Sequence, residues 1–114
     1  MFFDGNIGSF KDLLCRAVNG PIIFRGNEDA KVGELGIITG GAGSEVEAMV
    51  AEGLNSFVTG EGPHWSFPLA EELGLNVFHA GHYATETFGV RVLGELLVER
   101  FGLTQSFIDH PTGL

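Results

Sequence analysis

The amino-acid sequence predicts an α/β fold: a single three-layer domain over residues 1–114, with a mostly parallel sheet flanked by helices. The chain has 114 residues, the length of one domain. From residue 35 onward, short apolar segments alternate with helical patterns three times. Alternation at this spacing is typical of strand–helix–strand units with right-handed crossovers, which build parallel sheets. The 18 glycines follow no collagen-like period, so we expect them in turns and close backbone contacts.

The first third of the chain has the weaker pattern. Residues 9–18 predict a short helix, because apolar side chains recur on one face and Ser9 is a suitable N-cap. Residues 22–25 and 35–39 predict two strands. The second of these is apolar throughout, as a strand buried on both faces should be.

The remainder of the chain is more regular. Ser44 and Glu47 have the spacing of a capping box, which predicts a helix from there to about residue 52. The later elements are predicted as strands at 56–59, 76–80 and 105–108, a helix at 66–73, and a long helix from about 82 to 101. The long helix carries an apolar stripe, which consists of Val90, Leu93, Leu97 and Phe101.

Charge and composition disfavour some classes of function. Acidic residues outnumber basic ones by 15 to 6, and a net charge of −9 disfavours nucleic-acid binding while accommodating metal cations. The one cysteine, Cys15, forms no internal disulfide, which suits a reducing compartment. No signal-peptide pattern opens the chain, and no apolar run approaches the ~18 residues of a membrane span. We therefore expect a cytoplasmic protein without a membrane partner.

Three distinctive loops follow predicted strands. They are residues 40–44, 59–64 and 81–86. Because the carboxyl ends of parallel strands meet at one edge of a sheet, and ligands bind at that edge, the three loops predict a single site.

The most informative pair in these loops is His82 and Glu86. Four residues apart at the start of a helix, the two side chains share one face. Imidazole and carboxylate are usual ligands of Zn, Mn, Fe or Ni, so the pair is a candidate metal site; an ordinary surface pair is the alternative.

Other residues in the loops have two interpretations each. Glu61 and His64 are candidate catalytic residues, as a base or as extra ligands, or else a capping carboxylate and a solvated imidazole. The glycines of residues 40–43 suit either anion binding or tight packing. His79, inside a predicted strand, favours a structural role.

Four segments resemble a known family. They are Ile37–Gly43, Phe57–Glu61, Ala80–Glu86 and Phe107–Asp109. In order and separation over residues 35–112, they are similar to the carboxyl-terminal half of the Nif-three-like dinuclear metal-centre family, whose members are named GTP cyclohydrolase 1 type 2 homologues.

The resemblance implies an α/β fold, a pair of bridged metal ions and ring-shaped homo-oligomers. It assigns metal-ligand roles to His82 and Glu86, and His64 matches approximately a histidine near the metals. Family members are about twice as long, and their first half supplies a His-His pair and an Asp. No His-His pair occurs in this chain. The resemblance therefore implies either a homo-oligomer or a separate amino-half polypeptide as partner.

Two functions follow as expectations. The first is a metal-dependent hydrolase that lacks the ligands of the amino half, with purine-nucleotide ring opening as the activity implied by the resemblance. The alternative is a non-catalytic metal-binding or assembly module.

Overall fold

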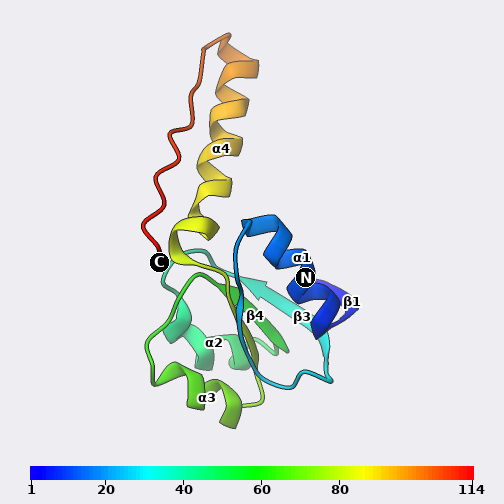
Figure 1. Ribbon diagram of the computed structural model, residues 1–114. Coiled ribbons are helices and arrows are strands. Elements are labelled where there is room, and N and C mark those ends of the chain that lie inside the picture. Colours follow the sequence, from blue (N-terminus) through cyan, green and yellow to red (C-terminus); the bar gives the residue numbers. More distant parts are fainter.

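Five strands form one mixed sheet, in the order β1-β3-β4-β5-β2, in the computed structural model, which describes all 114 residues (Figure 1). The strands are β1 (Phe2–Asn6), β2 (Ile23–Arg25), β3 (Lys31–Ile37), β4 (Ser56–Thr59) and β5 (Asn76–His79). The three inner strands, β3, β4 and β5, run parallel, whereas the edge strands β1 and β2 pair antiparallel with β3 and β5. The predicted parallel sheet is thus the centre of the observed one. The strand predicted at 35–39 is wrong in its bounds and burial, however, because β3 spans Lys31–Ile37 and only Val32 and Leu35 in it are fully buried.

Helices cover both faces of the sheet. They are α1 (Ile7–Val18), α2 (Val46–Ala51), α3 (Ser66–Glu72) and α4 (His82–Phe101), with a short 3₁₀ turn, η1 (Gly43–Glu45), before α2. Helix α1 lies on one face, and α2 and α3 lie on the other (Figure 1). This arrangement confirms the predicted three-layer α/β class.

The two core clusters follow from the alternation of side chains along the inner strands. Val58 and Phe78 point towards α1, whereas Phe57 and Val77 point towards α2 and α3. Every residue of β4 and β5 is buried, which explains why these strands read as continuous rather than alternating apolar segments.

The amino-terminal region differs from the sequence prediction. Strand β1 was not predicted, because an edge strand with only alternate residues half-buried has little apolar signal. Helix α1 begins two residues earlier than predicted, and its N-cap is Asn6, whose Oδ1 accepts the N–H of Ser9 at 2.8 Å. The predicted Ser9 cap is therefore wrong.

The predicted capping box at Ser44 is also wrong. The chain first makes the 3₁₀ turn η1, so α2 starts at Val46, beyond the serine. The Ser44 hydroxyl contacts the Glu45 carboxylate at 3.3 Å and caps no backbone N–H.

The end of the chain holds the largest differences. Residues 105–108 form no strand. Instead, the segment after α4 returns alongside this helix, which projects from the body (Figure 1). The apolar stripe of α4 is exposed, by 59% at Val90, 56% at Leu93, 39% at Leu97 and 62% at Phe101. No helix is both long and apolar enough to cross a membrane.

His79 ends β5 as a buried imidazole, 6% exposed, consistent with a structural role. Its ring stacks on that of Phe67, with centroids 4.6 Å apart and an angle of 18° between planes. Neither ring nitrogen makes a hydrogen bond of ordinary geometry, and a weak one to the backbone of Ile23 only partly opposes the lowering of the pKa of His79. Burial first, and then the positive charge of Arg25, lower the pKa of His79 below its ordinary value of 6.5.

A lowered pKa makes stability depend on pH. The unfolded chain binds the proton of His79 more tightly than the folded chain, so the free energy of unfolding should fall as pH is lowered below 6.5. His79→Phe retains the stacking and removes the titration. In urea unfolding, the difference between variant and wild type should be constant above about pH 7 and should shift in favour of the variant at lower pH. A difference independent of pH would contradict this.

Candidate metal centre

The three predicted loops meet at the carboxyl ends of β3, β4 and β5. Backbone hydrogen bonds join them directly: the N–H of Gly60 donates to Gly40 O at 2.9 Å, and that of Gly81 donates to Gly60 O at 3.0 Å. The N–H of Gly43 donates to Glu61 O at 3.0 Å. The loops therefore form one continuous surface at this rim.

Glycine is required where the loops cross. A Cβ on Gly60 would lie 2.6 Å from both Gly40 O and His82 Cα. Gly40 has a positive φ of 73°, and a Cβ there would lie 2.5 Å from Glu86 Oε1 and 3.2 Å from His82 Nε2. Of the two interpretations of residues 40–43, the structure supports tight packing, since side chains of α4 lie over the loop.

Two buried threonines fix the loop against helix α4 and strand β4. Thr85 Oγ1 accepts the N–H of Gly40 at 2.9 Å and donates to His82 O at 3.0 Å. Thr59 Oγ1 accepts the N–H of Ala42 at 3.2 Å and donates to Gly40 O at 3.2 Å. Sequence reasoning missed both residues; the only signal was a hydroxyl residue beside each glycine-rich loop.

The loops bring together three of the four predicted site residues. His82 Nδ1 lies 2.7 Å from Glu61 Oε1, and its Nε2 lies 3.2 Å from Glu86 Oε1. The side chains are 36% exposed at His82, 43% at Glu61 and 54% at Glu86. His64 stands apart, exposed, with its ring centroid 6.4 Å from that of Phe67 and with no hydrogen bond to the other three.

The carboxylates control the charge of the imidazole. The hydrogen bond to Glu61 is the main cause that raises the pKa of His82 above 6.5; desolvation opposes it, and the charges of Glu86 and Glu61 add to it. Because these groups are partly exposed, their ion pairs contribute little to folding stability. Folding stability therefore does not explain why these three side chains lie together, and binding at the protein surface explains it better.

This row of side chains fits one edge of a metal centre. A histidine that binds a metal through one ring nitrogen usually donates the N–H of the other to a carboxylate. With Nδ1–H donated to Glu61, the lone pair of His82 Nε2 lies beside Glu86, which supplies a nitrogen and an oxygen donor together. No group of three or more His, Cys, Asp and Glu side chains in the chain is placed to hold a metal ion. A complete centre therefore needs further donors.

Fold and site together define an α/β domain with a histidine–carboxylate row at the carboxyl rim of its inner strands. The family profile described as Duf34/NIF3 (NGG1p interacting factor 3) matches residues 6–112, and the chain belongs to this family. It is 38% identical over 106 residues to a GTP cyclohydrolase 1 type 2 homolog of Deinococcus radiodurans, covering 92% of this chain and 40% of that protein. The homolog of Pyrococcus horikoshii is 42% identical over 84 residues, which cover 74% and 33% of the two chains.

Solved structures agree on the fold. The protein ybgI, described as of unknown function, superposes with a TM-score of 0.90 at 28% identity, over 98% of this chain and 46% of its own. TTHA1606 from Thermus thermophilus gives a TM-score of 0.75 at 39% identity, over 91% and 42%. The chain thus spans less than half the length of the relatives it matches, as the sequence resemblance implied.

The contact between Gly40 and the side chains above it gives a matched pair of substitutions. Gly53 has a similar φ, 76°, but a Cβ there meets nothing within 4 Å. Gly53→Ala should therefore cost only the strain of a left-handed residue, about 1–2 kcal/mol. Gly40→Ala should cost more and should displace Glu86, which lowers the pKa of His82 in an NMR titration. Equal destabilisation with an unchanged His82 titration would contradict this packing role.

Proposed function

We propose that the chain contributes His82 and Glu86 to a divalent metal centre in a hydrolase similar to the GTP cyclohydrolase 1 type 2 homologs. The observation that carries the proposal is the 3.2 Å approach of His82 Nε2 to the Glu86 carboxylate, while Glu61 holds Nδ1. The donor set suits Zn, Mn, Fe or Ni. The names of the relatives support the hydrolase class.

Each residue has a distinct role in this proposal. A bound divalent ion supplies Lewis-acid polarisation and activation of water for hydrolysis. Glu61 holds the Nδ1 proton of His82, which fixes the tautomer that leaves Nε2 free to bind. Glu61 and the exposed His64 are the candidates for moving protons to and from the substrate, for which we propose a purine nucleotide.

The metal donors that this chain lacks can be supplied from the side of α4 that carries His82 and Glu86. At 3.6 residues per turn, the two proposed ligands share an arc of about 100° on α4 with part of its apolar surface. This arc, which we call the ligand face, contains His82, Glu86, Val90, Leu93, Leu97 and Phe101. Any protein surface that covers its apolar part lies next to the incomplete metal site.

We propose that the ligand face is covered by a polypeptide equivalent to the amino half of the relatives, which brings the remaining metal donors. Two observations support this partner. The ligand face is exposed along its apolar length, and the relatives carry more than half of their length outside the matched region. A second copy of the chain is the alternative occupant.

A non-catalytic metal-binding or assembly module is the second candidate function. The observation that favours it is that no three metal-ligating side chains are placed to hold an ion within this chain. In that case the ligand face would serve assembly, and bound metal would stabilise the contact.

The ligand assignment is tested by metal content. The purified chain, dialysed to equilibrium against buffer containing Zn²⁺ or Mn²⁺, should bind metal weakly, because further donors are missing, and His82→Ala should bind less, because the nitrogen donor is removed. His110→Ala is the matched control, since this exposed histidine lies outside the site. Elemental analysis measures both variants. Metal bound by His82→Ala at the wild-type level would overturn the assignment.

A measurement of GTP turnover then distinguishes the hydrolase from the non-catalytic assembly module. If the chain acts in a hydrolase, GTP ring opening by the metal-loaded protein with its partner should track metal content. His64→Ala and Glu61→Gln should reduce the rate by more than they reduce bound metal, since proton transfer typically contributes about 10²–10⁴-fold. Stable metal binding without turnover would favour the assembly module.

The ligand face is tested by a pair of substitutions of similar exposure. Leu93 is 56% exposed within this face, and Val92 is 53% exposed but lies about 100° away around α4. Without its partner, the wild-type chain should self-associate through the ligand face. Leu93→Glu should therefore shift native mass towards the monomer, and Val92→Glu should not. A monomeric wild type, or equal effects of both variants, would contradict this.

A further inference from the structure

A buried hydroxyl joins helix α4 to the loop that follows β3. Thr85 is only 6% exposed and lies on α4 between the two proposed metal ligands, His82 and Glu86. Its Oγ1 accepts the N–H of Gly40 at 2.9 Å and donates to His82 O at 3.0 Å. The bond from Gly40 is the only hydrogen bond between α4 and residues 38–45. The hydroxyl therefore fixes the position of this loop under the helix.

Gly40 connects this contact to the loop that carries Glu61. Its carbonyl oxygen accepts the N–H of Gly60 at 2.9 Å and that of Glu61 at 3.0 Å. Gly40 therefore binds α4 through its N–H and the loop after β4 through its oxygen. Three successive hydrogen bonds, of which Thr85 makes two, connect the backbone of His82 to that of Glu61. The side chains of these two residues are themselves in contact at 2.7 Å, so Thr85 helps to set how they meet.

Thr87, two residues further along α4, shows which of the two bonds of Thr85 is unusual. The Thr87 Oγ1 donates to Ala84 O at 3.1 Å, three residues back, as Thr85 donates to His82 O. A hydroxyl bond of this kind is ordinary for threonine in a helix. The Thr87 hydroxyl accepts no N–H from the loop after β3. The distinctive feature of Thr85 is therefore the bond from Gly40, whose buried N–H is costly to leave without an acceptor.

We propose that Thr85 is a positioning residue of the candidate metal centre, whose hydroxyl holds Glu61 against His82 Nδ1. This role rests on the function proposed above, in which Nδ1–H is donated to Glu61 so that Nε2 is free to bind a metal ion. Without the hydroxyl, Gly40 moves to satisfy its buried N–H, and Glu61 moves with it, because a backbone hydrogen bond joins the two. The imidazole then loses the carboxylate that fixes its tautomer.

The affinity for Zn²⁺ tests this role. Thr85→Val removes the hydroxyl and conserves the shape of the side chain. It should weaken Zn²⁺ binding about tenfold, since groups that orient metal ligands typically contribute about 10–100-fold to affinity. Thr85→Ser keeps the hydroxyl and should bind nearly as the wild type does. Thr87→Val is the matched control and should leave the affinity unchanged, because its hydroxyl bonds only within the helix. Isothermal titration calorimetry with Zn²⁺ alone measures all three variants.

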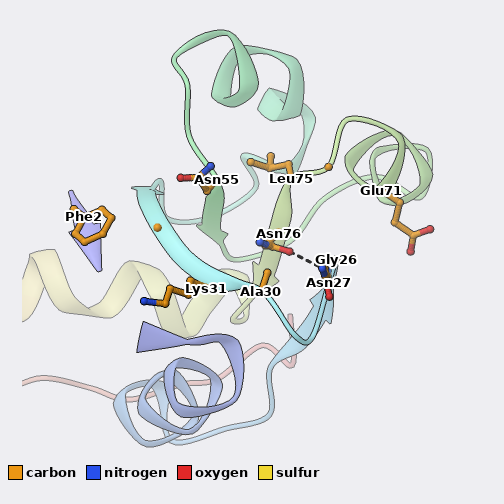
Figure 2. A pocket seen from close by; sticks show the side chains of 11 residues that line it. Phe2, Gly26, Asn27, Ala30, Lys31, Asn55, Glu71, Leu75 and Asn76 are labelled. Carbon is orange, nitrogen blue, oxygen red and sulfur yellow. Dashed lines mark hydrogen bonds between the residues drawn. The ribbon is translucent and has the colours of Figure 1, made fainter. Parts of the chain in front are cut away.

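A second control separates positioning from a loss of stability. At the opposite rim of the sheet, Asn76 is 5% exposed, and its Oδ1 accepts the N–H of Asn27 at 3.0 Å (Figure 2). Asn76→Leu removes a buried side-chain acceptor of a backbone N–H, as Thr85→Val does. It should lower the midpoint of urea unfolding and leave the affinity for Zn²⁺ at the wild-type value. Equal losses of affinity in Asn76→Leu and Thr85→Val would overturn the proposal, because reduced stability alone would then weaken the site.

The tautomer of His82 gives a readout that needs no metal. In the neutral imidazole, the ring ¹⁵N chemical shifts should show protonation mainly on Nδ1 in the wild type and a smaller share of this tautomer in Thr85→Val. If His82→Ala binds Zn²⁺ as the wild type does, the metal function proposed above fails, and the tautomer alone decides the role of Thr85.

The remaining outcomes also decide the proposal. If Thr85→Val does not fold, Thr85→Ala takes its place, since the smaller side chain leaves room for a water molecule to accept the N–H of Gly40. An unchanged tautomer in the variant that lacks the hydroxyl, or no recovery in Thr85→Ser, would overturn the positioning role.

Discussion

The candidate metal centre depends on backbone hydrogen bonds that extend the parallel sheet beyond the ends of its strands. Gly40, Gly60 and Gly81 continue the pairing of β3, β4 and β5 into their loops, at distances of 2.9 and 3.0 Å. A side chain on Gly60 would separate its two neighbours, because a Cβ there would lie within 2.8 Å of backbone atoms on both sides. The first turn of α4 consequently starts directly over this glycine layer, and His82 and Glu86 are held above Gly40.

That geometry explains both the chemistry of the row and its incompleteness. Glu61 and Glu86 contact opposite nitrogens of the His82 ring, so one carboxylate orients the imidazole while the other stands beside the free nitrogen. The same helix carries the proposed ligands at its base and apolar side chains above them. In the function proposed above, a single partner surface would supply both the further metal donors and the cover for this exposed helix.

Sequence reasoning succeeded where local pattern determines structure. The apolar segments of β4 and β5 and the glycine loops that follow them specify buried parallel strands and a common rim, and these predictions were confirmed. Residues Glu61, His82 and Glu86 were brought together as expected, whereas His64 was not, because loop residues after Gly62 turn towards α3.

The predictions were wrong where contacts between residues distant in the sequence determine the structure. The stripe of α4 has the spacing of a core-facing helix, but periodicity cannot distinguish a surface buried within the chain from one buried by a partner. Residues 105–108 have strand-like composition, yet they lie alongside α4, away from the sheet, and pair with no strand (Figure 1). Thr59 and Thr85 gave no pattern at all, since each acts through a single hydroxyl on the backbone of residues 40–42.

The projection of α4 has a consequence for local unfolding. Only Thr85 in this 20-residue helix is fully buried, and the core clusters include none of its residues. Few contacts therefore hold its outer turns to the sheet, so their amide protons should exchange with solvent faster than those of β4 and β5. Any protein surface that bound along the helix would slow this exchange, since binding and the order of the outer turns would then be thermodynamically linked.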